Sequence, residues 1–158
     1  MANKLDGSTK NQEMESVLLD LIKSLQDGQK GFAEIGEHLK DATLKRYFLA
    51  ESLKRASFRA ELEGQLHIAG MADVKESGSV AGALHRSWGE LKAKLGGGDH
   101  SLLETAEKGE DEAKDAYKKA LEHELPLPIR SLLSEQQAHV LTSHDYVRNQ
   151  RDALAAAK

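Results

Sequence analysis

Apolar residues recur at three- and four-residue spacing along most of the chain, which predicts amphipathic α-helices. No segment alternates apolar and polar residues with the two-residue period of a half-buried strand. Glycines and prolines divide the helical pattern into separate elements. The predicted helices are, to within a few residues, 11–39, 42–69, 80–95, 99–123 and 128–156.

The lengths of the connections predict how these helices pack. A tight turn joins the first two helices and a short turn at 124–127 joins the last two, so each pair should form an antiparallel hairpin. A connection of about 30 residues, which includes the short helix, lies between the hairpins. This order predicts an all-α fold, a ferritin-like four-helix bundle of two antiparallel hairpins joined by a long crossover that carries a short helix. The alternative is a five-helix up-and-down bundle. We expect residues 1–10 to be a flexible N-terminus and residues 11–158 to form a single domain.

Composition agrees with this fold and excludes several classes of function. Only 4% of the residues are aromatic, which disfavours a β-sandwich or barrel. The lack of cysteine excludes disulfides, thiolate zinc sites, iron–sulfur clusters and cysteine nucleophiles. A net charge of −4 gives no overall basic surface, so we expect no nucleic-acid partner. No apolar run reaches the roughly 20 residues of a membrane span, and the first ten residues hold no signal-peptide core. We therefore expect a cytoplasmic protein with no membrane contact.

Polar residues interrupt the inward-facing apolar stripes at corresponding positions of the two hairpins. Gln29 and Glu110 lie on the first helix of each hairpin, and Glu61 and His144 lie on the second. Ferritin-like metal proteins carry a Glu on each of two helices and a Glu-x-x-His motif on each of the other two. Glu61, Glu110 and His144 are the candidate metal ligands that this chain offers from such a set, with Gln29 nearby.

The candidate ligand set is incomplete. Phe58 and Leu141 stand where the Glu of each Glu-x-x-His motif would be, and the first helix supplies a neutral amide. We therefore expect a hydrogen-bonded polar network that fixes the register of the helices rather than a di-iron centre. The alternative is a single Fe, Mn or Zn ion held by the remaining ligands. In both cases Glu110 should be buried and paired with a residue of another helix, first of all His144.

The segment His85-Arg86-Ser87-Trp88 holds the only tryptophan of the chain. We expect Trp88 to pack the crossover helix onto the bundle and Arg86 to pair with a carboxylate. The alternative is a small-ligand site formed by His85 and Arg86 beside Trp88.

Two further groups of charged residues follow patterns typical of solvated helix faces. Glu135 and His139 stand four residues apart, and the basic run Lys54-Arg55 has acidic residues nearby. We expect both groups on the surface.

Several segments together resemble a bacterial ferritin-like four-helix-bundle domain of unknown function. The segments are Asp27-Gly28-Gln29-Lys30-Gly31-Phe32, residues 78–88, Gly109-Glu110-Asp111, Gln136 and His144-Asp145. The resemblance covers about residues 15–150 and implies a layout similar to that of rubrerythrin and ferritin. It implies no established activity, and neither the residues nor the resemblance decide whether the protein is an enzyme.

These observations lead to two hypotheses about function. The first is a structural or binding role, associated with stress, that acts through a homo-oligomer or a protein partner. The second is a metal-binding oxidoreductase or a metal-storage protein that uses the Glu and His residues of the bundle core.

Overall fold

A computed structural model describes residues 2–71, 88 and 91–157, and all regular structure among them is helical. The helices are α1 (Ala2–His38), α2 (Ala42–Ile68), α4 (Leu91–Lys94), α5 (Asp99–Leu121) and α6 (Leu127–Ala156). The all-α prediction is therefore confirmed for this part of the chain. Helix α1 begins at Ala2, well before the predicted start at residue 11.

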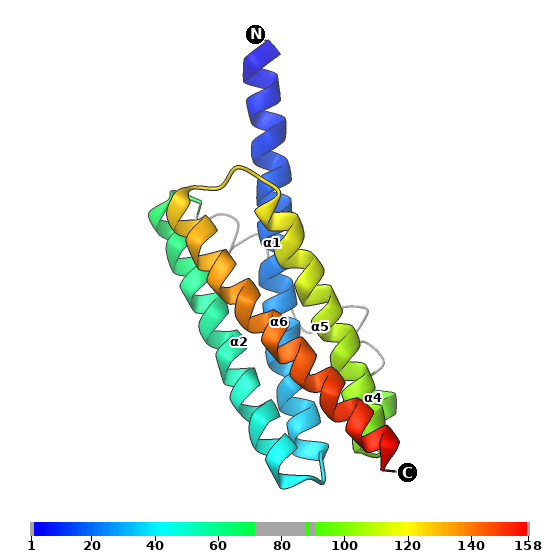
Figure 1. Ribbon diagram of the computed structural model, residues 1–158. Coiled ribbons are helices and arrows are strands. Elements are labelled where there is room, and N and C mark those ends of the chain that lie inside the picture. Colours follow the sequence, from blue (N-terminus) through cyan, green and yellow to red (C-terminus); the bar gives the residue numbers. More distant parts are fainter. Residues whose placement is uncertain (1, 72–87, 89–90, 158) are drawn as a thin grey trace.

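The four long helices pack as a bundle (Figure 1). Helix α1 packs against α2 and α5, and α6 packs against the same two helices. Helix α2 ends at the end of the bundle where α6 begins, whereas α5 begins at the opposite end, next to α4 (Figure 1). Helices α2 and α5 thus run in the same direction. The first turns of α1 extend beyond the ends of the other helices (Figure 1).

None of the helices in the described ranges combines the length and the apolar character that crossing a membrane would require.

Local hydrogen bonds fix the turn between α1 and α2. Asp41 is the N-cap of α2, as its position in the sequence predicts, and its side chain accepts a hydrogen bond from the backbone N–H of Leu44 (2.9 Å). The carboxylate of Asp99, in the first turn of α5, accepts the backbone N–H groups of Lys40 (2.9 Å) and Asp41 (3.0 Å). One acidic side chain therefore holds the turn of the first hairpin against the start of the second. At the other end of α2, Gly70 has a φ of 77°, a left-handed conformation that suits glycine and ends the helix.

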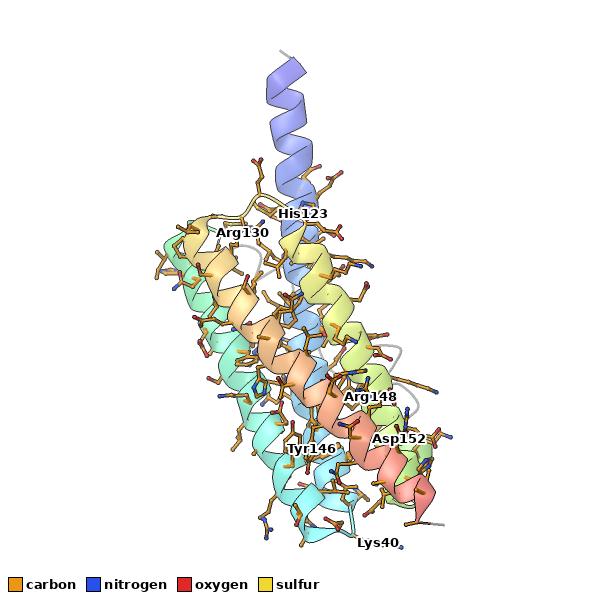
Figure 2. The ribbon with its side chains drawn as sticks, in the orientation of Figure 1. Lys40, His123, Arg130, Tyr146, Arg148 and Asp152 are labelled. Atoms are coloured by element: carbon orange, nitrogen blue, oxygen red, sulfur yellow. The ribbon has the colours of Figure 1, made fainter. Side chains whose placement is uncertain are left out.

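The turn between α5 and α6 is held by an arginine. Arg130, on α6, donates hydrogen bonds to the carbonyl oxygens of Leu121 (3.1 Å) and His123, at the C-terminal end of α5. Figure 2 shows Arg130 and His123 together at this turn. The guanidinium satisfies carbonyls that have no partner within their own helix and places a positive charge at the negative end of the helix dipole.

The core consists of two hydrophobic clusters with a polar layer between them. The first cluster includes Leu25 of α1 and Tyr117 of α5, and the second includes Phe32 of α1 and Val147 of α6. Every long helix carries buried polar residues between its contributions to the two clusters. These residues, here called the polar layer, are Asp27, Glu51, Ser52, Arg55, Glu110, Ser143 and His144.

Trp88 packs onto the bundle in the second cluster. Its side chain is 3% exposed, and its ring centroid lies 5.6 Å from that of Phe32. The indole lies directly over Gly31 of α1 and Gly109 of α5, where a Cβ atom on either glycine would overlap the ring. These glycines therefore provide a close approach, and this packing is the one expected for Trp88. His85 and Arg86 lie outside the described residues, so their role as a ligand site stays a prediction.

We predict that Gly31→Ala and Gly109→Ala each lower the free energy of unfolding by about 1–3 kcal/mol, because the added methyl group displaces Trp88. Gly64→Ala on α2 is the matched control, since a Cβ there meets nothing within 4 Å. This control should gain up to about 1 kcal/mol from the better helix propensity of alanine. Urea unfolding followed by circular dichroism measures all three variants. Equal changes in the free energy of unfolding at the three glycines would contradict the contact of Trp88 with Gly31 and Gly109.

Candidate functional site in the polar layer of the bundle

Arg55 of α2 is the centre of the polar layer. Its side chain is 1% exposed, and its guanidinium meets Glu110 of α5 through two contacts, Nη1 to Oε1 at 2.7 Å and Nη2 to Oε2 at 3.0 Å. Its Nε donates to Oε2 of Glu51, one turn earlier on α2, at 3.2 Å. Two parallel contacts between a guanidinium and a carboxylate are among the strongest ion-pair geometries in proteins. Arg55 thus joins two helices of the bundle in its interior.

The network continues from α2 to α6. Nε2 of His139 donates to Oε1 of Glu51 at 2.7 Å. On its other side, the guanidinium of Arg55 lies over the ring of Phe32 on α1, 4.9 Å from the centroid. The network therefore contacts all four long helices.

Burial and ion pairing oppose each other in the pKa values of this network. Burial alone would raise the pKa of Glu51, but the hydrogen bond from His139 and the charge of Arg55 outweigh it, so the pKa lies below its usual value of 4.5. Burial alone would lower the pKa of Arg55, but Glu110 and Glu51 raise it instead. Arg55 therefore stays charged and cannot serve as an acid or a base, which indicates a structural role for the network.

A second buried hydrogen-bond chain joins α5, α6 and α2 beside the network. Tyr117 donates to Oε1 of Gln136 at 2.8 Å, and Nε2 of Gln136 donates to the carbonyl of Phe58 at 3.1 Å. Burial raises the pKa of Tyr117, so its phenol keeps the proton that it donates.

The predicted metal ligands do not come together. Glu110 is fully buried and paired with another helix, as expected, but its partner is Arg55 and not His144. Glu61 is exposed and accepts a hydrogen bond from Ser57, one turn earlier on its own helix. Gln29 is half-buried, and its backbone carbonyl accepts a hydrogen bond from Ser52 of α2 (2.7 Å).

His144 instead faces the carboxylates of two other residues of α5. Its Nε2 lies 2.8 Å from Oδ1 of Asp111 and 3.8 Å from Oε1 of Glu107. Its Nδ1 lies 3.1 Å from Oδ1 of Asp145. Among the residues that the structure describes, Glu107, Asp111 and His144 form the one group of three side chains placed to hold a metal ion. The ring donates a hydrogen bond to Asp145, which lowers the pKa of that carboxyl. His144 thus belongs to an acidic group next to the core network and not to the network itself.

The burial of Arg55 corrects the expectation that Lys54-Arg55 lies on a solvated face. The apolar positions of α2 follow heptad spacing, and that spacing continues through Glu51 and Arg55 between Phe48 and Phe58. The heptad register alone predicts that both residues are buried, whereas their charge predicts a position on the surface. His139 likewise contacts Glu51 on another helix instead of Glu135 on its own.

A family model described as a domain of unknown function, DUF2383, matches residues 13–123. The chain belongs to this family. The DUF2383 match includes most of α1 and all of α2 and α5, and therefore Glu51, Arg55 and Glu110, but it ends before α6 with His139 and His144. No match to a curated protein is found. The family supplies no activity, so the function has to be argued from the site.

We predict that Glu110→Leu lowers the free energy of unfolding by about 3–5 kcal/mol, because it leaves the charge of Arg55 buried with only one carboxylate. The triple variant Glu51→Gln/Arg55→Met/Glu110→Leu removes all three charges and should be more stable than Glu110→Leu alone. Glu61→Leu, at an exposed position of α2, is the control and should stay within about 0.5 kcal/mol of the unmodified protein. A Glu110→Leu variant as stable as the unmodified protein would contradict the ion-pair account.

We also predict a specific loss of stability in acid. The pKa of Glu51 is lower in the folded state, so its contribution is present above the unfolded value of 4.5 and disappears as the pH falls through the folded pKa. The free energy of unfolding should therefore fall below about pH 5, and Glu51→Gln should make this dependence shallower. Urea unfolding at a series of pH values measures both slopes. Identical slopes would show that Glu51 is not responsible.

Proposed function

We propose that this protein is a ferritin-like four-helix bundle with a structural or binding role and without a di-metal centre in its core. One observation carries the proposal: the buried guanidinium of Arg55 contacts both Glu51 and Glu110. Glu51 and Glu110 are two of the three buried carboxylates in the described polar layer, and Asp27 is the third. A permanent cation of the chain thus stands where ferritin-like relatives would need free ligands.

The direction of the helices supports the ferritin-like layout. Helices α2 and α5 run in the same direction, so α2 ends at one end of the bundle and α5 begins at the other (Figure 1). Two antiparallel hairpins whose second and third long helices are parallel are the arrangement found in ferritin-like folds, where one long crossover joins the hairpins.

The residues at the positions of the Glu-x-x-His motifs do not fit a di-metal centre. Glu61 is exposed, and Leu141 is 42% exposed, so the motif positions on α2 and α6 face outward in part. The core residue Glu110 has both oxygens engaged by Arg55. A di-metal site would need these oxygens as ligands and would leave the buried guanidinium without its partner, which is costly.

A binding role requires a partner, and we propose a second copy of the chain or another protein. We propose that the exposed apolar side chains of Leu53, Ile68 and Leu127, which are 73%, 78% and 74% exposed, take part in this contact. The stress-associated role and the cytoplasmic location stay predictions.

The alternative function, a metal-binding oxidoreductase or a metal-storage protein, is favoured by one observation. Glu107, Asp111 and His144 place three ligand atoms within 4.8 Å of one another, apart from the network around Arg55.

We predict fewer than two irons per chain when the protein is produced without a His tag in iron-supplemented medium and measured by elemental analysis. Glu110→Gln is the informative variant, because a core di-iron centre would lose its metal with this change and the proposed ionic network has none to lose. Two irons per chain that disappear in Glu110→Gln would overturn the proposed role.

A further inference from the structure

The contact between α5 and α6 holds a group of side chains that the core network does not use. Glu107 and Asp111 stand one turn apart on α5, and His144 faces them from α6. His144 is 5% exposed, whereas the side chain of Asp111 is 58% exposed. The group therefore connects the interior of the bundle with its surface.

The ring of His144 has a carboxylate at both nitrogens. Nε2 lies 2.8 Å from Asp111, and Nδ1 lies 3.1 Å from Asp145. Carboxylates only accept hydrogen bonds, and a neutral imidazole has one N–H, so one ring nitrogen would point a lone pair at an acceptor. A cation resolves this conflict, either as a second proton on the ring or as a metal ion. If Nδ1–H donates to Asp145, the lone pair of Nε2 faces Glu107 and Asp111, which is the carboxylate–histidine–metal arrangement of protein metal sites.

The distances suit a metal ion of the first transition row. Tetrahedral coordination with bonds of about 2.0–2.1 Å places neighbouring ligand atoms about 3.3 Å apart. Nε2 of His144 lies 2.8 Å from Asp111 and 3.8 Å from Glu107, so both distances are within about half an ångström of this value, and the three ligand atoms all lie within 4.8 Å of one another.

The surroundings orient the ligands and leave an entry path. Arg151 of α6 contacts Oε2 of Glu107, which keeps Oε1 on the side of His144. Asp111 lines an open groove of about 300 Å³ together with Lys114, Gln137 and other residues of α5 and α6. An ion and its water ligands can enter from this side.

We propose that Glu107, Asp111 and His144 bind one divalent transition-metal ion, with Zn²⁺ as the best match, and that Asp145 positions the imidazole. The imidazole ligand selects against Mg²⁺ and Ca²⁺, which take oxygen ligands. Three protein ligands leave a fourth position for water on the groove side. This inference does not depend on the role proposed for the bundle core.

The test is calorimetric titration of ZnCl₂ into the full chain, produced without a His tag and treated with chelator. We expect one Zn²⁺ per chain, unaffected by millimolar Mg²⁺. His144→Ala and Asp111→Asn should each weaken binding at least about tenfold. Asp145→Asn should weaken it by about 10- to 100-fold, the usual effect of losing a partner that orients a histidine ligand. Asp111 is largely exposed, so Asp111→Asn keeps the test valid if His144→Ala does not fold.

Two control variants separate this site from its surroundings. Asp115→Asn removes the same charge from the same groove one turn further along α5, and it should bind Zn²⁺ as tightly as the unmodified chain. Glu110→Gln changes the core network and should also leave Zn²⁺ binding unchanged. A core di-iron centre would lose its iron in the same variant, so the two tests are distinguishable. Absence of Zn²⁺ binding by the unmodified chain, or binding by the His144 and Asp111 variants as tight as that of the unmodified chain, would overturn the proposal. An equal loss in Asp115→Asn would show nonspecific attraction to the acidic surface and would also overturn it.

Discussion

The ion pair between Arg55 and Glu110 is the constraint on which the alignment of the helices depends. Removing a guanidinium and carboxylates from water costs several kcal/mol per ion, and only well-formed contacts offset this cost. The two contacts between Arg55 and Glu110 exist only while α2 and α5 keep their register, whereas the contact between Arg55 and Glu51 lies within α2. A slide of α2 along α5 by one helical turn, about 5.4 Å, would separate Arg55 from Glu110 and leave the Glu110 carboxylate buried without its ion pair. The hydrophobic clusters on either side are less selective, because apolar cores repack more readily.

The network around Arg55 and the group around His144 represent two different arrangements of charge in one bundle. In the core, each carboxylate contact is matched by a donor, since Arg55 and His139 supply N–H groups to Glu51 and Glu110. Around His144, acceptors outnumber donors, and the exposed side of Asp111 opens to solvent. Glu51 and Glu110 therefore share a permanent cation of the chain. The proposed Zn²⁺ would supply a cation to the carboxylates that face His144.

The fold could be predicted largely from local sequence patterns, whereas the pairing in the site could not. Helix positions follow from apolar periodicity and from caps such as Asp41, which depend on neighbouring residues only. Helix α1 begins at Ala2, whereas apolar periodicity predicted a start near residue 11, because residues 2–10 lack that periodicity. The burial of Glu110 followed from its register, but its partner depended on how α2 faces α5. Charge favours the surface for Arg55, and only tertiary packing reverses that preference.

The packing of Trp88 against Gly31 and Gly109 makes its fluorescence an intrinsic probe of local structure. Trp88 is the only tryptophan, and its ring is enclosed by α1 and α5 together with Phe32. Its fluorescence therefore reports the docking of one residue near the start of α4, while the circular dichroism of the chain reports the four long helices. If Trp88 leaves its place while the bundle stays folded, the emission will shift to the red before helicity falls. The two signals can thus distinguish the release of Trp88 from the unfolding of the bundle.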